Sequence, residues 1–141
     1  MLRIINLFDN GFSGNLPSEY FQIWNAMIMV ERKKLTYMQA ISQEVPLRNC
    51  TFMTLYMYKV TVDNKGTHRL YEKIQKAFVA VDLSNNKFEG EIPESLGRLG
   101  GLQMLNLSDY NLTSVIPSSL ANLIELESLD LSRNLLSGEI P

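Results

Sequence analysis

Apolar residues recur with a period of 24 along the C-terminal part of the chain. Each period holds a short stretch in which apolar and polar residues alternate, as in "VDLSNN" from Val81 and "LDLSRN" from Leu129. Such alternation predicts a short strand with one buried face. A fixed period of about 20 to 50 residues is typical of stacked repeats, because one unit cannot bury its apolar face alone. The equivalent apolar positions are Phe78/Leu102/Leu126, Val81/Leu105/Leu129, Leu83/Leu107/Leu131 and Phe88/Leu112/Leu136.

Beyond the strand, each unit carries residues that suit a sharp turn inside a core. The unit reads L-x-x-L-x-L-x-x-N-x-L-x-G-x-I-P, with the asparagine at Asn86 and Asn134. A buried amide side chain is both donor and acceptor, so it is expected to pair backbone groups that the turn leaves without partners. The glycine permits tight backbone geometry, and the proline gives an extended segment. The pattern predicts an α/β-type leucine-rich-repeat solenoid with a parallel concave β-sheet.

A fourth copy of the unit lies far upstream, from Leu2 to Pro17. Leu2 precedes Phe78 by 76 positions, which is one unit of 24 plus 52, so a non-repeat island interrupts the solenoid. The predicted organisation is a repeat over residues 1–25, an island over residues 26–77, and three repeats, the last one truncated, over residues 78–141.

The third repeat departs from the pattern at two positions. Tyr110 replaces the asparagine and Ser114 replaces the glycine. We expect the phenol either to swing out or to be accommodated with its hydroxyl paired, and this repeat to be the weak one. Tyr110→Asn is therefore predicted to stabilise the fold by about 1 kcal/mol.

The 24-residue unit resembles the plant-specific class of extracellular leucine-rich repeats. The whole arrangement resembles the C-terminal end of plant receptor-like proteins, whose repeats are broken by an island. "LPSEYFQIWNAM" at residues 16–27 leads out of the repeat before the island as in such proteins, and "YKVTVDNKG" at residues 58–66 is similar to their island segment. The resemblance covers nearly the whole chain.

The resemblance implies part of a cell-surface receptor ectodomain in defence or developmental signalling, on the extracellular side of the plasma membrane and without its own kinase domain. It implies a peptide, protein or glycan ligand, and a co-receptor kinase that docks on the repeats after the island. A receptor-kinase ectodomain, which shares these repeats, and a soluble repeat inhibitor or scaffold are the alternatives. The island favours the receptor, because compact inhibitors resemble an uninterrupted stack.

Neither a signal peptide, a membrane-spanning run nor a terminal cap is recognisable in the sequence. The longest purely apolar run is "AMIMV" at residues 26–30, far short of the roughly 18 residues that span a bilayer. The membrane is expected to be reached only through a segment absent from this sequence, and we interpret the chain as a fragment. Because end repeats need polar caps, the isolated chain is expected to aggregate or be partly unfolded, with no signalling activity of its own.

Outward-facing strand positions are expected to form columns across the concave surface. Neighbouring strands lie about 4.8 Å apart, so each column would be a continuous strip. The first repeat places Ile4 and Phe8 there, an apolar patch covered either by a partner or, as we favour, by the island through apolar residues such as Met27, Ile28 and Met29. The columns are Asn6, Asp82, Asn106, Asp130 and Phe8, Ser84, Ser108, Ser132; the predicted partner-binding residues are Ile4, Phe8, Lys65, Gly66, Asp82, Ser84, Asp130 and Arg133.

Within the island, the alternation of Val60 and Val62 predicts a strand, followed by a turn at Lys65 and Gly66. The loop has one of two roles: it presents Lys65 to a ligand or a co-receptor, or it is a purely structural turn. Three motifs for N-glycosylation are also present. Their asparagines either carry a glycan or are ordinary solvated residues. The acceptors are Asn49 in "NCT", Asn106 in "NLS" and Asn111 in "NLT".

Charge and side-chain chemistry narrow the function further. Residues 26–77 carry nine Lys or Arg against four Asp or Glu, a net of +5, whereas residues 78–141 carry three against nine, a net of -6. The basic excess is modest and is expected to be mostly a solvated charge run, so nucleic acid is not a predicted partner. Cys50 and His68 are the single cysteine and histidine. We therefore predict no enzyme, no metal site and no cofactor.

Overall fold

The computed structural model describes residues 2–28, 39–47, 50–57, 59–64, 67–72 and 78–141. Short strands and single helical turns alternate along the chain, as expected for small repeats. In chain order the elements are β1 (Ile4–Asn6), β2 (Ser13–Asn15), α1 (Ser18–Ile23), α2 (Asn25–Ile28), β3 (Gln39–Leu47), β4 (Cys50–Met57), β5 (Val60–Asn64), β6 (Thr67–Tyr71), β7 (Ala80–Asp82), β8 (Lys87–Gly90), the 3₁₀ helix η1 (Glu94–Arg98), β9 (Met104–Asn106), β10 (Asn111–Leu112), the 3₁₀ helix η2 (Ser118–Asn122) and β11 (Ser128–Asp130).

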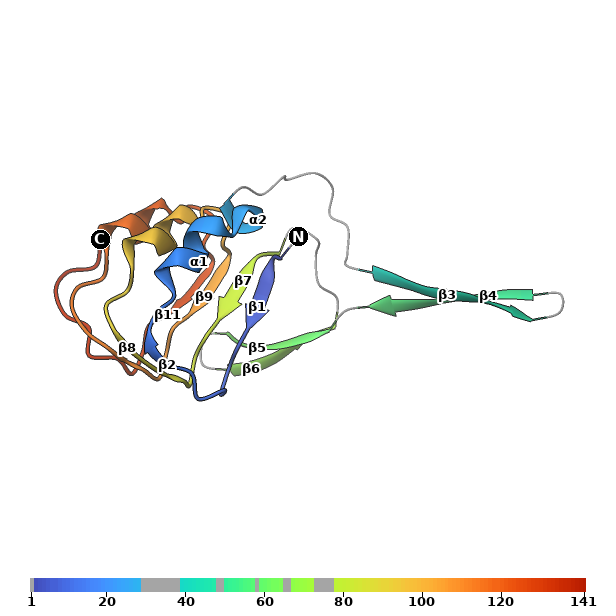
Figure 1. The fold of residues 1–141 in the computed structure, drawn as a ribbon, viewed down its shortest axis with the longest axis horizontal. Helices are drawn as coiled ribbons and strands as arrows, with labels where there is room; N and C mark the ends of the chain where they lie inside the picture. The colour runs from blue at the N-terminus through green and yellow to red at the C-terminus, as the bar shows by residue number, and fades with distance from the viewer. Residues whose placement is uncertain (1, 29–38, 48–49, 58, 65–66, 73–77) are drawn as a thin grey trace.

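One strand from each repeat enters the main sheet, which has the order β1-β7-β9-β11 (Figure 1). All three pairings are parallel. Ile4 lies opposite Ala80, an offset of 80 − 4 = 76 residues, and both later pairings have an offset of 24. The strand before the island therefore pairs directly with the strand after it. The predicted solenoid with a parallel sheet is confirmed.

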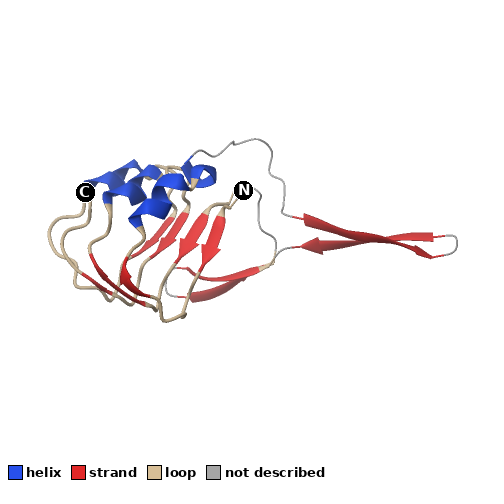
Figure 2. Cartoon of the chain, in the orientation of Figure 1, coloured by secondary structure: helices blue, strands red, loops and turns tan. Residues whose placement is uncertain are grey.

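The hydrophobic core lies between the main sheet and a row of short helices on the other side (Figure 2). Pro93 and Pro117 hold an extended conformation at the N-cap positions of η1 and η2, where the proline ring fixes φ just before the helical turn. The two helices pack closely, since a Cβ on Gly97 would lie 2.2 Å from the Ser119 carbonyl oxygen. The fully buried core side chains include Phe21, Met27, Leu83, Leu96, Leu99, Leu102, Leu105, Leu107 and Leu112.

A second sheet, with the order β10-β8-β2, forms where each repeat turns away from the main sheet. Its pairs are also parallel, and Ser13 lies opposite Lys87 while Asn111 lies opposite Glu89. These offsets, 87 − 13 = 74 and 111 − 89 = 22, are each two residues smaller than in the main sheet. The same shift across the island and after it shows that the coils stack uniformly.

The asparagines of the repeat motif join neighbouring coils, as predicted. Asn86 Nδ2 donates to the carbonyls of Leu83 at 2.6 Å and Leu7 at 2.8 Å, and Asn86 Oδ1 accepts from the Phe12 amide at 3.0 Å. Asn134 repeats this geometry one coil later, donating to Leu131 and Leu107 and accepting from Leu112. Each asparagine thus satisfies backbone groups of its own turn and of the preceding repeat.

Tyr110 takes neither of the two predicted arrangements. Its side chain is buried, and its ring packs edge to face on Phe88 with centroids 5.5 Å apart. The hydroxyl has no hydrogen-bond partner among the described residues. Burial raises the pKa of the Tyr110 phenol, the Asp82 carboxylate adds to this, and the nearby Asn86 amide opposes it without reaching hydrogen-bond geometry. The phenol stays neutral, and the third repeat exchanges asparagine hydrogen bonds for aromatic packing.

The described part of the island consists of two antiparallel hairpins. Strands β3 and β4 pair from Gln39 opposite Met57 to Leu47 opposite Cys50, and this hairpin projects away from the solenoid (Figure 1). Strands β5 and β6 form a second hairpin beneath the main sheet, and β5 contacts β9. The predicted strand at residues 60–64 is confirmed, whereas Lys65 and Gly66 lie outside the described residues.

The apolar residues expected to cover Ile4 and Phe8 lie elsewhere. Met27 and Ile28 belong to or pack against the main core, and the Met27 carbonyl accepts a hydrogen bond from the Gly101 amide at 2.9 Å. Met29 lies outside the described residues. That part of the prediction is wrong, because α2 continues the helical row of the solenoid. The island boundaries at residues 26 and 77 stay a prediction.

Both ends of the repeat stack present apolar side chains. Leu2 is 53% exposed at the first repeat, and Ile140 is 86% exposed at the last. Ile140 also helps to line an open apolar hollow of about 300 Å³ together with Leu129, Leu131, Ile116 and Leu120. The expected tendency of the isolated chain to aggregate stays a prediction.

Tyr110→Phe is expected to leave the free energy of unfolding unchanged or to raise it by up to about 1 kcal/mol, because it removes only the unpaired hydroxyl. Tyr110→Asn is now expected to lower it by about 2 to 4 kcal/mol, because the ring leaves a cavity beside Phe88. Urea titration followed by the fluorescence of Trp24, the single tryptophan, measures both. A more stable Tyr110→Asn than Tyr110→Phe would contradict the packing argument.

Ser114→Gly is expected to stabilise the chain by about 1 kcal/mol, because Ser114 has a φ of 73° in the left-handed region, where a Cβ is disfavoured. The equivalent Gly90 has a φ of 82°. Gly90→Ser is the matched control and should destabilise by a similar amount. Equal midpoints for the two variants in the urea titration would refute this account.

Candidate functional site

Four side chains of one kind form a strip across the concave face, which we call the Asx strip. Asn6, Asp82, Asn106 and Asp130 each end a strand of the main sheet. In each case Oδ1 accepts a hydrogen bond from the amide two residues on, at 3.0 or 3.1 Å. This local bond fixes the side-chain rotamer and leaves the other terminal atom, Nδ2 or Oδ2, for a second contact.

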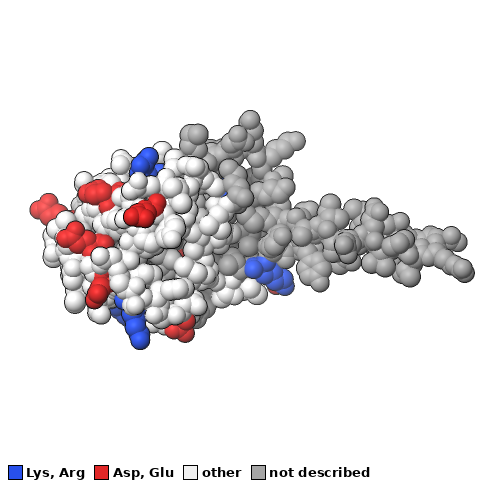
Figure 3. Space-filling view, in the orientation of Figure 1, with Lys and Arg blue, Asp and Glu red and all other residues white. Residues whose placement is uncertain are grey.

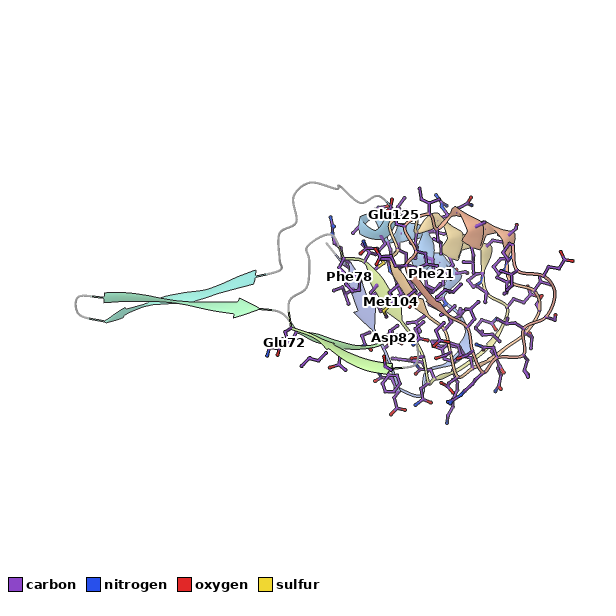
Figure 4. All side chains as sticks on the ribbon, turned by 180° about the vertical axis from the view of Figure 1, so that it is seen from behind. Phe21, Glu72, Phe78, Asp82, Met104 and Glu125 are labelled. Carbon is purple, nitrogen blue, oxygen red and sulfur yellow. The ribbon has the colours of Figure 1, made fainter. Side chains whose placement is uncertain are left out.

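The β5–β6 hairpin lies against this strip. Asn6 Nδ2 donates to the Thr61 carbonyl of β5 at 2.8 Å, and β5 also contacts β9 in the third repeat. Asp82 lies between the main sheet and the hairpin in Figure 4. An extended strand thus lies against the solenoid strands, and Asn6 of the strip is bonded to it.

Asp82 and Ser84 were expected on an exposed concave surface, and that expectation is wrong. Both are 1% exposed, and the Ser84 hydroxyl donates to Asp82 Oδ1 at 2.6 Å. The same holds for the third repeat, where Asn106 and Ser108 are buried. Strands β7 and β9 are consequently buried on both faces, with the core on one side and the hairpin side on the other.

Ile4 and Phe8, the other predicted residues of the first repeat, do not form one exposed patch. Ile4 is half-buried and packs against a small cluster of Ala80 and Met104, with Phe78 beside it. Phe8 is 36% exposed and lies beyond the end of β1. The apolar residues on this side of the sheet therefore pack mainly on one another.

The strip is more open at its fourth position. Asp130 is half-buried, and Ser132 and Arg133 are exposed. Arg133 Nη1 donates to Asp109 Oδ1 at 2.8 Å, and this hydrogen bond raises the pKa of the guanidinium. Arg133 is thus a paired surface residue that links the fourth repeat to the third, with three-quarters of its side chain exposed.

Acidic side chains gather over the end of the solenoid that lies away from the hairpins (Figure 3). Glu125, Glu127 and Asp130 belong to this end, as parts of or neighbours to β11. The hairpin supplies the opposite edge of the concave surface, with exposed Thr61, Thr67 and Leu70. The open end of the strip is suited to partners that offer basic groups or hydrogen-bond donors.

No group of three or more His, Cys, Asp or Glu side chains that suits a metal ion occurs in the described ranges. The surface instead offers backbone edges, amides, hydroxyls and carboxylates in rows. Such rows suit the recognition of another chain rather than the activation of a nucleophile.

Of the glycosylation motifs, Asn49 lies outside the described residues. Asn106 is 1% exposed. Asn111 is exposed at the start of β10, on the second sheet. Of these two motifs, which lie five residues apart, the first therefore has a buried asparagine and the second an exposed one.

Sequence reasoning missed the contact between Asn6 and Thr61. The recurring N-L-F, D-L-S, N-L-S and D-L-S segments predict the local turns, but no periodic signal marks the segment that crosses them. The charge contrast between island and repeats was the available hint that the two pack together.

Comparison with known protein families gives a match to the leucine rich repeat over residues 79–136. Residues 79–136 are thus leucine-rich repeats by sequence as well as by fold. Among curated proteins of Arabidopsis thaliana, Receptor-like protein 32 is 49% identical over 98 residues and Receptor-like protein 19 is 43% identical over 100 residues. Each match covers 70% of this chain and 10% of the relative, so the chain spans about a tenth of the curated relatives it matches. The resemblance to plant receptor-like proteins is confirmed.

A solved leucine-rich-repeat structure, the Arabidopsis receptor kinase HAESA in complex with the peptide hormone IDA and the co-receptor SERK1, is 45% identical. It aligns with 44% of this chain and 10% of its own, at a TM-score of 0.42.

Within the described residues of the present chain, no helix is long and apolar enough to cross a bilayer.

Asn6→Asp is expected to loosen the hairpin while keeping the local turn, because it replaces the donor to the Thr61 carbonyl with an acceptor. Losing one such bond costs about 1 kcal/mol, so hydrogen exchange of the β5 amides should be roughly fivefold faster. Asp130→Asn, at the other end of the strip, is the control and should leave β5 exchange unchanged. Equal exchange in all three proteins would show that Asn6 does not hold the hairpin.

Proposed function

We propose that this chain is the part of a plant cell-surface receptor at which the last repeats and the island together bind a partner. The observation that carries the proposal is the β5–β6 hairpin docked on the Asx strip through Asn6 and Thr61. The concave surface combines side chains of the repeats with the β5–β6 hairpin, so it offers a partner groups that repeats without an island lack. The kinship with proteins named as receptor-like supports a binding role rather than an enzymatic one.

The partners we propose are a co-receptor kinase and a peptide, protein or glycan ligand. The more open end of the strip, around Asp130, Ser132 and Arg133, is the docking side for the co-receptor kinase, because its acidic surface and exposed hydroxyl suit basic and donor groups. The exposed side of the hairpin, including Thr67 and Leu70, is the side for the ligand. The receptor would hold both on the extracellular side of the plasma membrane.

Lys65 and Gly66, between β5 and β6, are part of the same proposal. In the sequence they connect the two paired strands Val60–Asn64 and Thr67–Tyr71. We propose that Lys65 contacts the ligand or the co-receptor, and the alternative is a purely structural turn.

Ser132→Tyr in the full receptor is expected to weaken binding of a co-receptor ectodomain at least tenfold, because a ring on the exposed strip blocks close approach. SERK1 is the probe, and the affinity is measured by biolayer interferometry. Ser118→Tyr, the same change at an exposed serine of η2 on the helical side of the solenoid, is the matched control and should bind normally. The docking side is wrong if Ser132→Tyr binds as tightly as the unchanged receptor, or if Ser118→Tyr loses binding to the same extent.

Lys65→Glu distinguishes these two interpretations of Lys65. It should reduce either ligand response or co-receptor recruitment in the full receptor while leaving β5 exchange unchanged. If both responses persist, Lys65 belongs to a structural turn.

A further inference from the structure

Two glycosylation motifs with the same spacing, N-L-S at Asn106 and N-L-T at Asn111, lie five residues apart on different faces. We propose that Asn111 carries an N-linked glycan, whereas Asn106 stays unmodified in the folded chain and helps to hold the β5–β6 hairpin. This assignment goes beyond the proposed binding function, since it concerns a covalent modification and the face that it closes.

Asn106 lies in the third strand of the four-stranded sheet and is 1% exposed. The serine of its motif, Ser108, is 6% exposed, and its amide is bonded to Asn106 Oδ1 at 3.0 Å. Both polar residues of the motif are therefore enclosed, and β5 packs over this strand. A sugar on Asn106 Nδ2 has room only if the hairpin leaves.

Asn111 differs in each of these respects. It begins β10, an edge strand of the second sheet, and both Asn111 and the motif threonine Thr113 are exposed. The backbone beneath is fixed, since the Thr113 amide donates to the Gly90 carbonyl at 2.8 Å and Leu112 is fully buried. A rigid extended backbone with two outward polar side chains presents the acceptor amide without any rearrangement.

The reaction transfers an oligosaccharide from a lipid-linked pyrophosphate donor of the secretory pathway. The Asn111 Nδ2 attacks the anomeric carbon, so a C–N bond forms while the bond between that carbon and the phosphate oxygen breaks. The lipid pyrophosphate leaves with the bonding electrons, and the amide loses one proton to base. The product keeps one N–H on Nδ2 and adds a bulky, solvated group.

Modification of Asn106 before folding would produce a distinguishable molecule. The glycan would hold β5 away from β9, so the concave face would be open and the β5 amides would exchange freely. In the folded chain, hairpin docking and a glycan on Asn106 exclude each other. A glycan on Asn111 instead shields the second sheet around Glu89 and Thr113 and leaves the concave face free for partners.

The test uses the full chain, secreted from plant cells through a fused signal peptide, with Asn49→Gln to remove the third motif. Glycopeptide mass spectrometry reports occupancy, and hydrogen exchange reports the docking of β5. Asn111→Asp and Asn106→Asp are compared, since each removes an acceptor amide and only the second removes a donor beneath the hairpin. Ile124→Thr supplies a positive control, because it creates an N-L-T motif at exposed Asn122, and Ile124 is 83% exposed.

We expect Asn111 to be occupied and Asn111→Asp to lose the glycan with β5 exchange unchanged. Asn106→Asp should keep the glycan on Asn111 and show roughly fivefold faster β5 exchange. A secreted chain without a glycan on Asn111 overturns the proposal, most directly when Asn122 is modified in Ile124→Thr. A monomer modified at Asn106 whose β5 amides are as protected as in the unmodified chain overturns it as well.

Discussion

The structure depends on the pairing of backbone groups where the chain turns inside its core. Each coil leaves the main sheet after three residues, and no strand partner is left for the carbonyls at that point. Asn86 supplies the missing bonds, to its own turn and to Leu7 and Phe12 of a coil 76 positions earlier. A buried unpaired carbonyl or amide costs about 1 to 3 kcal/mol, so this one side chain sets how closely two coils approach. The closing of a long island adds only a slowly growing entropic term, which is why the stack continues in register across it.

The third repeat shows that this constraint has more than one solution. Where Tyr110 stands, the coils are held by ring packing along a row, Phe12 on Phe88 at 6.3 Å and Phe88 on Tyr110 at 5.5 Å. The carbonyls that an asparagine would have bonded in this repeat are served by its neighbours, since Asn86 reaches Leu83 and Asn134 reaches Leu107. An irregular coil is therefore tolerated when regular coils flank it.

The repeats could be predicted from sequence because their information is periodic. The offsets of 24 and 76 between apolar residues reappear as strand register, and the asparagine motif reappears as inter-coil bonds. The candidate site could be predicted only in part, because residue types such as Asp82 and Asn106 are compatible with either an open or a covered concave face. Their burial accompanies the docking of a non-repeating hairpin, Val60–Tyr71, which leaves no periodic signal in the sequence. Met27 was misassigned for a related reason, since an apolar residue at a boundary belongs equally well to either neighbour on composition alone.

The entry and exit of the island lie close together on the solenoid, because the Gly101 amide donates to the Met27 carbonyl and the Gln103 amide donates to the Val79 carbonyl. Because both ends of the island are anchored on adjacent coils, the length of the island does not change how the coils stack. Insertions, deletions and substitutions in the island can therefore accumulate without disturbing the stack, provided that a short extended stretch still fits across the concave face. The island and the repeats can then change at different rates within one chain.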